Sequence, residues 1–105
     1  MKKYNVLISD KALRDMEAIY EYIALELLSP ETAMRLYNRI SDSILSLEAM
    51  PERIKIMDSE PEHSLGFRRL LVDHYSAFFV IRGEDVHVVR VLYSASDIEK
   101  RLNED

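Results

Sequence analysis

The spacing of apolar residues changes once along the chain, and this change limits the folds that the sequence can adopt. Up to residue 47 the apolar residues recur every three or four positions, which is typical of amphipathic helices. From residue 67 onward they form segments rich in β-branched and aromatic side chains, which are typical of strands. The sequence therefore predicts helices in the first half and a sheet in the second half.

The first half is predicted to contain one strand followed by two helices. Residues 4–9 are strand formers, and Ser9 or Asp10 is suited to cap the next helix. Ser29-Pro30 then restarts the helix, and Met50-Pro51 ends it, because a residue before proline avoids helical backbone angles. The link between the helices is short, so we expect an antiparallel αα-hairpin. The apolar stripes of the two helices are Ala12, Met16, Ile19, Ile23 and Leu27, and Ala33, Leu36, Ile40, Ile44 and Leu47.

The second half is predicted to be a loop followed by a three-stranded meander. The loop covers residues 52–66, with a short edge strand at residues 53–57. The expected strands are residues 67–72, 75–81 and 86–93, and residues 94–102 form a short polar helix. The fold class is therefore α+β, in the order β-α-α-β-β-β. The meander and the N-terminal strand make a small antiparallel sheet, which the αα-hairpin covers on one face. The 105 residues fit one domain, residues 1–105.

Composition excludes several classes of function. The chain has no cysteine, and no histidine has a second ligand at a suitable spacing, so we expect no metal site and no cofactor. A net charge of −5 argues against a broad nucleic-acid surface or sequence-specific nucleic-acid binding. No apolar run approaches the roughly 20 residues that cross a bilayer, and no apolar signal follows the first lysines. We therefore expect a cytoplasmic protein that is not in a membrane.

Several motifs occur in order along nearly the whole chain. Residues 6–23 read Val-Leu-Ile-Ser-Asp-Lys-Ala-Leu-Arg-Asp-Met-Glu-Ala-Ile-Tyr-Glu-Tyr-Ile. Two later segments are Gly66-Phe67-Arg68-Arg69 and Arg90-Val91-Leu92-Tyr93-Ser94-Ala95-Ser96-Asp97. With these motifs the chain resembles the RelE/ParE superfamily of toxins from bacterial type II toxin–antitoxin systems. The two later segments are similar to signatures of its ParE branch.

The resemblance implies a toxin that inhibits growth by poisoning DNA gyrase, takes part in plasmid stabilisation and is neutralised by a cognate antitoxin. The alternative is a ribosome-dependent mRNA endoribonuclease of the RelE branch. That branch usually carries an arginine early in the strand after the tight turn, and this chain has Ser76 there. The branch also tends to have basic, His or Tyr residues after the last strand, and this chain has Ser94-Ala95-Ser96 there. RNA cleavage needs a base, an acid and cations. We therefore expect no catalytic residues. A third possibility is a non-toxic family member that only binds an antitoxin.

The residues expected to contact the target are Arg68, Arg69, Arg90, Tyr93 and Asp97. Arg68 and Arg69 have an alternative role as partners of Glu60 or Glu62. Arg90 either points out of an open sheet face or pairs with Asp97 and caps the terminal helix.

Two further groups lie on the predicted helices. Apolar residues outside the stripes predict an antitoxin-binding surface, chiefly at Tyr20, Leu25 and Tyr37. The acidic residues of the first helix are expected to form a solvated face. They are Asp15, Glu17, Glu21 and Glu26.

Overall fold

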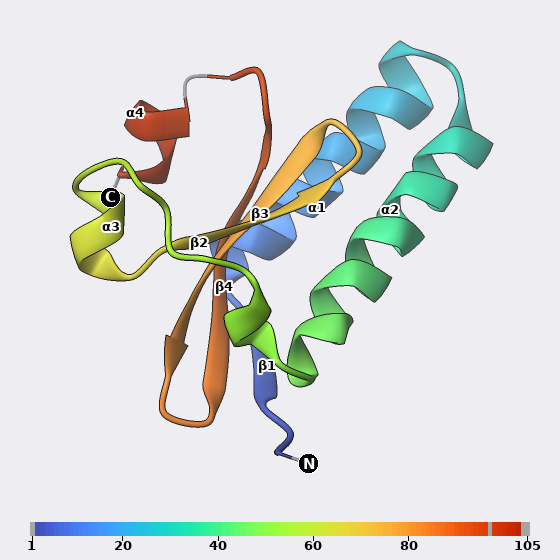
Figure 1. Ribbon diagram of the computed structural model, residues 1–105. Helices are drawn as coiled ribbons and strands as arrows, with labels where there is room; N and C mark the ends of the chain where they lie inside the picture. The colour runs from blue at the N-terminus through green and yellow to red at the C-terminus, as the bar shows by residue number, and fades with distance from the viewer. Residues whose placement is uncertain (1, 97, 104–105) are drawn as a thin grey trace.

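The computed structural model describes residues 2–96 and 98–103, which form one four-stranded sheet with helices on both faces (Figure 1). The strands are β1 (Asn5–Ile8), β2 (Arg68–Val72), β3 (Tyr75–Arg82) and β4 (Asp85–Tyr93). The helices are α1 (Asp10–Glu21), α2 (Pro30–Leu45), α3 (Glu62–Leu65) and α4 (Ile98–Leu102). Shorter turns of helix are η1 (Tyr22–Glu26), a π-helix, and the 3₁₀-helices η2 (Ser46–Glu48) and η3 (Pro51–Arg53).

The sheet has the strand order β1-β4-β3-β2 and confirms the α+β class. The meander β2-β3-β4 is antiparallel, as expected, and its turns hold Asp73 at φ 55° and Gly83 at φ 62°. β1 instead runs parallel to β4, from Asn5 beside Asp85 to Ile8 beside Val88. The sheet is therefore mixed rather than antiparallel throughout, because the hairpin and the meander together bring β4 back in the direction of β1.

The start of α1 follows directly from the sequence. The Ser9 side chain caps the helix by accepting a hydrogen bond from the Ala12 backbone N–H at 3.0 Å. The same hydroxyl donates to the Val89 carbonyl at 3.0 Å, so the cap also fixes the helix against β4. The helix then continues into η1 and ends at Glu26. Two residues later the chain turns at Leu28, whose backbone is left-handed at φ 54°.

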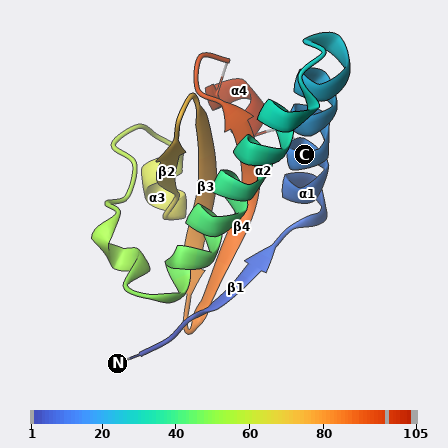
Figure 2. The same cartoon turned by 90° about the vertical axis from the view of Figure 1, so that its right-hand side faces the viewer.

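The hairpin of α1 and α2 packs its two stripes on one face of the sheet, as expected (Figure 2). Leu27 is the exception, since it is 56% exposed. The wider π-turn of η1 changes the helical phase after Glu21, so position 27 no longer follows the stripe. The core on this side includes Ala12, Met16, Ile40, Ile44, Leu47, Phe79, Val86, Val88 and Val91.

The opposite face of the sheet is covered in part by α3 and α4 (Figure 1). Phe78, Leu92 and Leu102 form a second buried cluster there, packed against Met57, Phe67, Val89 and Ile98. The sequence predicted cover on one face of the sheet only, and for this region that prediction is wrong. The two large apolar residues Phe78 and Leu92 need cover, and the C-terminal helix supplies it.

Residues 52–66, which were predicted to be a loop with a short edge strand, instead contain the short helix α3 and a single bridge to β2. Of the expected edge strand, only Ile56 pairs with β2, through one bridge to Arg68. The short helix α3 was not expected, and its Glu62 is only 2% exposed rather than solvated. Within the described residues, none of the helices is both long enough and apolar enough to cross a membrane.

Candidate functional site

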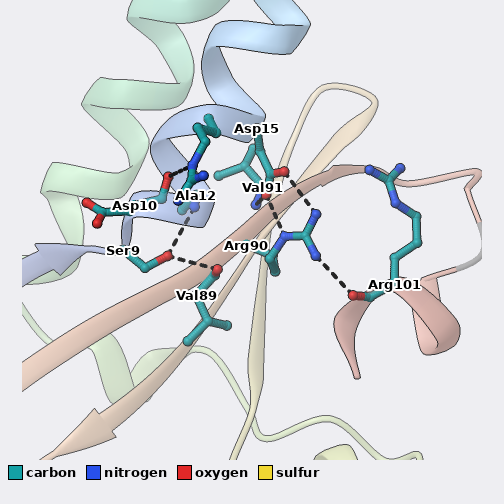
Figure 3. A network of polar contacts seen from close by, with 9 residues as sticks. Ser9, Asp10, Ala12, Asp15, Val89, Arg90, Val91 and Arg101 are labelled. Carbon is teal, nitrogen blue, oxygen red and sulfur yellow. Dashed lines mark hydrogen bonds and ion pairs between the residues drawn. The ribbon is translucent and has the colours of Figure 1, made fainter. Parts of the chain in front are cut away.

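Asp15 and Arg90 form the centre of a polar network between α1, β4 and α4 (Figure 3). The Arg90 guanidinium donates to both Asp15 carboxylate oxygens, at 2.8 and 3.0 Å, and to the Arg101 carbonyl at 3.0 Å. The Asp15 carboxylate also accepts the Val91 backbone N–H at 2.9 Å. Both side chains are only 12% exposed. The pair therefore fastens the hairpin and the C-terminal helix to the same strand.

The position of this network follows from where β1 ends. β1 pairs with β4 as far as Val88, and beyond that point none of the described residues pairs with this edge of β4 as a strand. Side chains from the start of α1 take its place, with Ser9 at the Val89 carbonyl and Asp15 at the Val91 N–H. Asp15 thus satisfies a buried backbone donor that would otherwise cost stability.

The network corrects two expectations. Asp15 is not on a solvated face, although Glu17, Glu21 and Glu26 are exposed as expected. Arg90 does not point out of an open sheet face. A β-bulge at Val89 puts Arg90 opposite Phe78, whereas Val86 and Val88 face the hairpin core. Asp97, the expected partner of Arg90, lies outside the described residues. Arg90 was also expected to cap the terminal helix, and it does donate a hydrogen bond to the Arg101 carbonyl of α4.

Arg68 and Arg69 point to opposite sides of β2 and have different partners. The Arg68 guanidinium donates to the carbonyls of Glu52 and Ile54, which fixes the loop against β2. A hydrogen bond from the Tyr4 hydroxyl lowers the pKa of the Glu52 carboxyl, and the nearby Arg68 charge adds to the effect. Neither arginine has the expected acidic partner. Glu60 instead accepts from Ser64, and Glu62 accepts from Ser59 and Asn103.

Arg69 belongs to an arginine–serine cluster with Ser76 and Ser94 on the face opposite the hairpin. The Arg69 Nε donates to the Ser76 hydroxyl at 2.9 Å, and the Ser76 and Ser94 hydroxyls are 2.8 Å apart. The Arg69 guanidinium also lies 5.7 Å from the centre of the Phe78 ring. The fold thus joins the two positions that the sequence analysis compared with the ribonuclease branch. Among the described residues, this cluster contains one cation and two hydroxyls, and no carboxylate or imidazole belongs to it.

Three tyrosines meet where the hairpin overhangs the end of the sheet. The rings of Tyr75 and Tyr93 pack edge to face at 5.6 Å, and Tyr93 is 48% exposed. Burial raises the pKa of the Tyr75 hydroxyl, and the neighbouring Tyr93 and Tyr22 add to the rise. We call the hollow around Tyr22, Leu27, Tyr75 and Tyr93 the tyrosine cleft.

Tyr20 and Tyr37 meet on the outer side of the hairpin. Their rings pack edge to face at 6.2 Å, and both side chains are half-buried. They line a hollow of about 350 Å³, the hairpin groove, together with Glu17, Glu21, Met34 and Asn38. Leu25, the third residue expected at the antitoxin surface, is 68% exposed on η1 but does not line this groove.

Asp15 and Tyr22 belong to these sites but were not among the predicted site residues. Asp15 had a usable signal, since a carboxylate beside the apolar stripe and an arginine inside an apolar strand both need a partner. Tyr22 had none, because the π-turn that places it is not visible in the spacing. Among residues 2–96 and 98–103, no group of three or more histidine or acidic side chains is arranged to hold a metal ion.

One comparison with known proteins matches a family, and another shows which solved structures share the fold. The family model described as the ParE toxin of the type II toxin–antitoxin system, parDE, matches residues 6–98. The fold is similar to a chain of the chromosomal ParDE system of P. aeruginosa, with a TM-score of 0.73 and 24% identity over 89% of this chain and 98% of that one. It is also similar to a RelBE2 complex from Mycobacterium tuberculosis, with a TM-score of 0.55 and 18% identity over 87% and 98% of the two chains. A third similar structure is a RelB–RelE complex from Methanococcus jannaschii, with a TM-score of 0.52 and 18% identity over 90% of this chain and 96% of that one. No curated protein matches the sequence significantly.

Proposed function

The chain belongs to the ParE toxin family of type II toxin–antitoxin systems, and we propose that it stops bacterial growth by poisoning DNA gyrase in the cytoplasm. In this proposal the protein acts by binding and needs no catalytic group of its own. The observation that carries it is the arginine–serine cluster at Arg69, Ser76 and Ser94.

The chemistry of that cluster argues against the alternative, a ribosome-dependent mRNA endoribonuclease. Attack by a 2′-hydroxyl needs a group to remove its proton, a group to protonate the leaving oxygen, and cations around the phosphate. Arg69 could supply a positive charge, but serine hydroxyls are weak acids and weaker bases. Ser76 is also completely buried, which leaves no room for an RNA ribose beside it. A binding-type poison fits these residues better.

We further propose that a cognate antitoxin covers the hairpin groove. The ParDE and RelBE relatives are known as toxin–antitoxin systems or complexes. The groove supports this seat because Tyr20 and Tyr37 line it beside Met34, which is 48% exposed. Exposed apolar side chains gathered around a hollow usually mark a partner surface. Leu25 extends this surface toward the tip of the hairpin.

We propose fewer residues as target contacts than the sequence implied. Tyr93 and Arg69 remain candidates because each keeps part of its side chain accessible. We assign Arg68 and Arg90 to holding the fold, because the loop carbonyls and Asp15 occupy their guanidinium groups.

The test is a supercoiling and cleavage assay with purified gyrase, ATP and an excess of the purified protein. We expect inhibited supercoiling and accumulation of linear plasmid. Unimpaired supercoiling with no linear DNA would remove the gyrase assignment. Codon-specific cuts in primer extension on translating ribosomes would establish the alternative.

A further inference from the structure

The tyrosine cleft is larger than the hairpin groove and lies on another side of α1. It consists of two adjoining hollows of about 570 and 700 Å³, which share Tyr22, Leu27 and Tyr75. The hairpin tip extends past the β2–β3 turn, so η1 forms one wall and the ends of β3 and β4 form the other (Figure 1). On α1 the cleft is lined by Ala18 and Ile19, and the groove by Glu17 and Tyr20.

Three of the large apolar or aromatic side chains that line the cleft contribute little to the core. Tyr22 is 55% exposed, Leu27 is 56% exposed and Tyr93 is 48% exposed. Each leaves about half of its surface in water, although all three meet at one hollow. Tyrosine and arginine are also the residue types that carry most of the binding energy at protein interfaces. This composition points to a binding surface rather than to incomplete packing.

The charges at the cleft select the kind of partner. The two carboxylates at its lining are already paired, Asp15 with Arg90 and Asp73 with Arg39 at 2.8 Å. The lining also holds Arg35 and Arg101, and within the described part of the chain neither has an ion pair with a carboxylate. An excess of positive charge therefore remains in a protein whose net charge is −5.

An acidic protein segment fits this surface better than a nucleic acid does. Nucleic-acid affinity comes mainly from many phosphate contacts, and only two cations of the cleft lack a carboxylate partner. The apolar floor of Ile19, Leu27 and Leu36 offers more to aliphatic or aromatic side chains than to a sugar–phosphate chain.

We propose that the tyrosine cleft is the seat of the target, where it receives a segment of gyrase that carries apolar anchors flanked by carboxylates. The inference rests on the proposed function for the identity of the target. It keeps Tyr93 as a target contact and sets Arg69 aside, because Arg69 does not line the cleft. The target and the antitoxin are thereby assigned to two surfaces that can be changed separately.

The experiment uses purified gyrase holoenzyme and measures the concentration of toxin that halves supercoiling. The two cleft variants are Tyr22→Ala and Arg35→Glu. Leu45→Ala is the control for the first, because Leu45 is 56% exposed at the other end of the hairpin. Arg82→Glu is the control for the second, because it makes the same charge change at the exposed β3–β4 turn. Thermal melting and antitoxin affinity report whether each variant is folded.

We expect the concentration that halves supercoiling to be roughly tenfold higher for each cleft variant than for the parent, which is the loss typical of an interface anchor. Both controls should stay within about twofold of the parent, and all four variants should keep the parent's melting temperature and antitoxin affinity. If the parent inhibits gyrase and the folded cleft variants inhibit it at the same concentration, the cleft assignment alone is overturned. A parent that leaves gyrase unaffected would overturn the proposed function as well. Binding of DNA alone by the parent, lost in Arg35→Glu but not in Arg82→Glu, would show that the cleft holds nucleic acid instead.

Discussion

Removing the Asp15 carboxylate should destabilise the protein more than removing any exposed carboxylate. Asp15→Ala deletes the acceptor of two hydrogen bonds from Arg90 and of one from the Val91 N–H. Both charged side chains are 12% exposed, so water replaces the lost contacts poorly. Breaking a buried ion pair in this way costs about 3–5 kcal/mol. Arg90 keeps its bond to the Arg101 carbonyl, which favours the lower end, about 3 kcal/mol.

The loss converts into a measurable shift in melting temperature. An unfolding entropy of about 2.1 cal/mol/K per residue gives this 105-residue chain roughly 220 cal/mol/K. Each kcal/mol then lowers Tm by about 4.5 °C, so Asp15→Ala should melt roughly 14 °C below the parent. Differential scanning calorimetry at neutral pH measures this directly.

Two further variants decide whether the reasoning is right. Asp58→Ala removes a carboxylate from the pair with Lys55, in which the Lys55 and Asp58 side chains are 80% and 83% exposed. This variant should lower Tm far less, because water screens an exposed ion pair. Asp15→Ala combined with Arg90→Met removes both buried charges and should recover part of the loss. A Tm for Asp15→Ala no lower than that for Asp58→Ala would refute the claim that the network holds α1 and α4 to β4.

Three other outcomes are expected. Leu28→Gly should raise the free energy of unfolding by up to about 1 kcal/mol in urea titration, because Leu28 has a left-handed backbone and is 83% exposed; a lower value would contradict the strain. A hydrogen bond from Ser59 holds the pKa of the Glu62 carboxyl below its ordinary value, although burial opposes it, so this group stabilises the fold above about pH 4.3 and loses that effect as pH falls. Glu62→Gln should therefore flatten the acid limb of the stability curve, and an unchanged limb would exclude Glu62 as its source. Tyr37→Glu should weaken antitoxin binding at least tenfold in titration calorimetry while Leu45→Glu does not; equal affinity in a folded protein would move the antitoxin off the hairpin groove.

The order of elements was predictable because the local signals agree with the tertiary packing. Ser9 caps α1, Pro30 begins α2, and the alternating residues of β3 and β4 divide between two buried clusters. The sequence did not reveal the cover on the second sheet face. The four-residue helix α3 carries too little periodicity to be recognised. The C-terminal helix α4 was expected from the sequence, but as a polar helix, and the need to bury Phe78 and Leu92 was the only sign that it packs on the sheet.

The candidate site was less predictable because it depends on contacts between residues far apart in the sequence. The sequence marked Arg90 as a charge in an apolar strand, but not its partner 75 positions earlier. A one-residue bulge at Val89 then changed which face Arg90 takes. By contrast, the resemblance to the superfamily singled out Ser76 and residues 94–96 as places where the ribonuclease branch has basic residues. The meander brings Ser76 and Ser94 into contact because β3 and β4 are adjacent.

Poisoning of gyrase can be tested inside growing cells with one time course. The protein is expressed alone in growing bacteria, and samples taken from the first minutes are probed for gyrase covalently attached to broken DNA and for cut mRNA. A gyrase poison should produce gyrase-linked breaks first and leave transcripts intact while growth stops. Codon-specific mRNA cleavage preceding any DNA break would contradict gyrase poisoning.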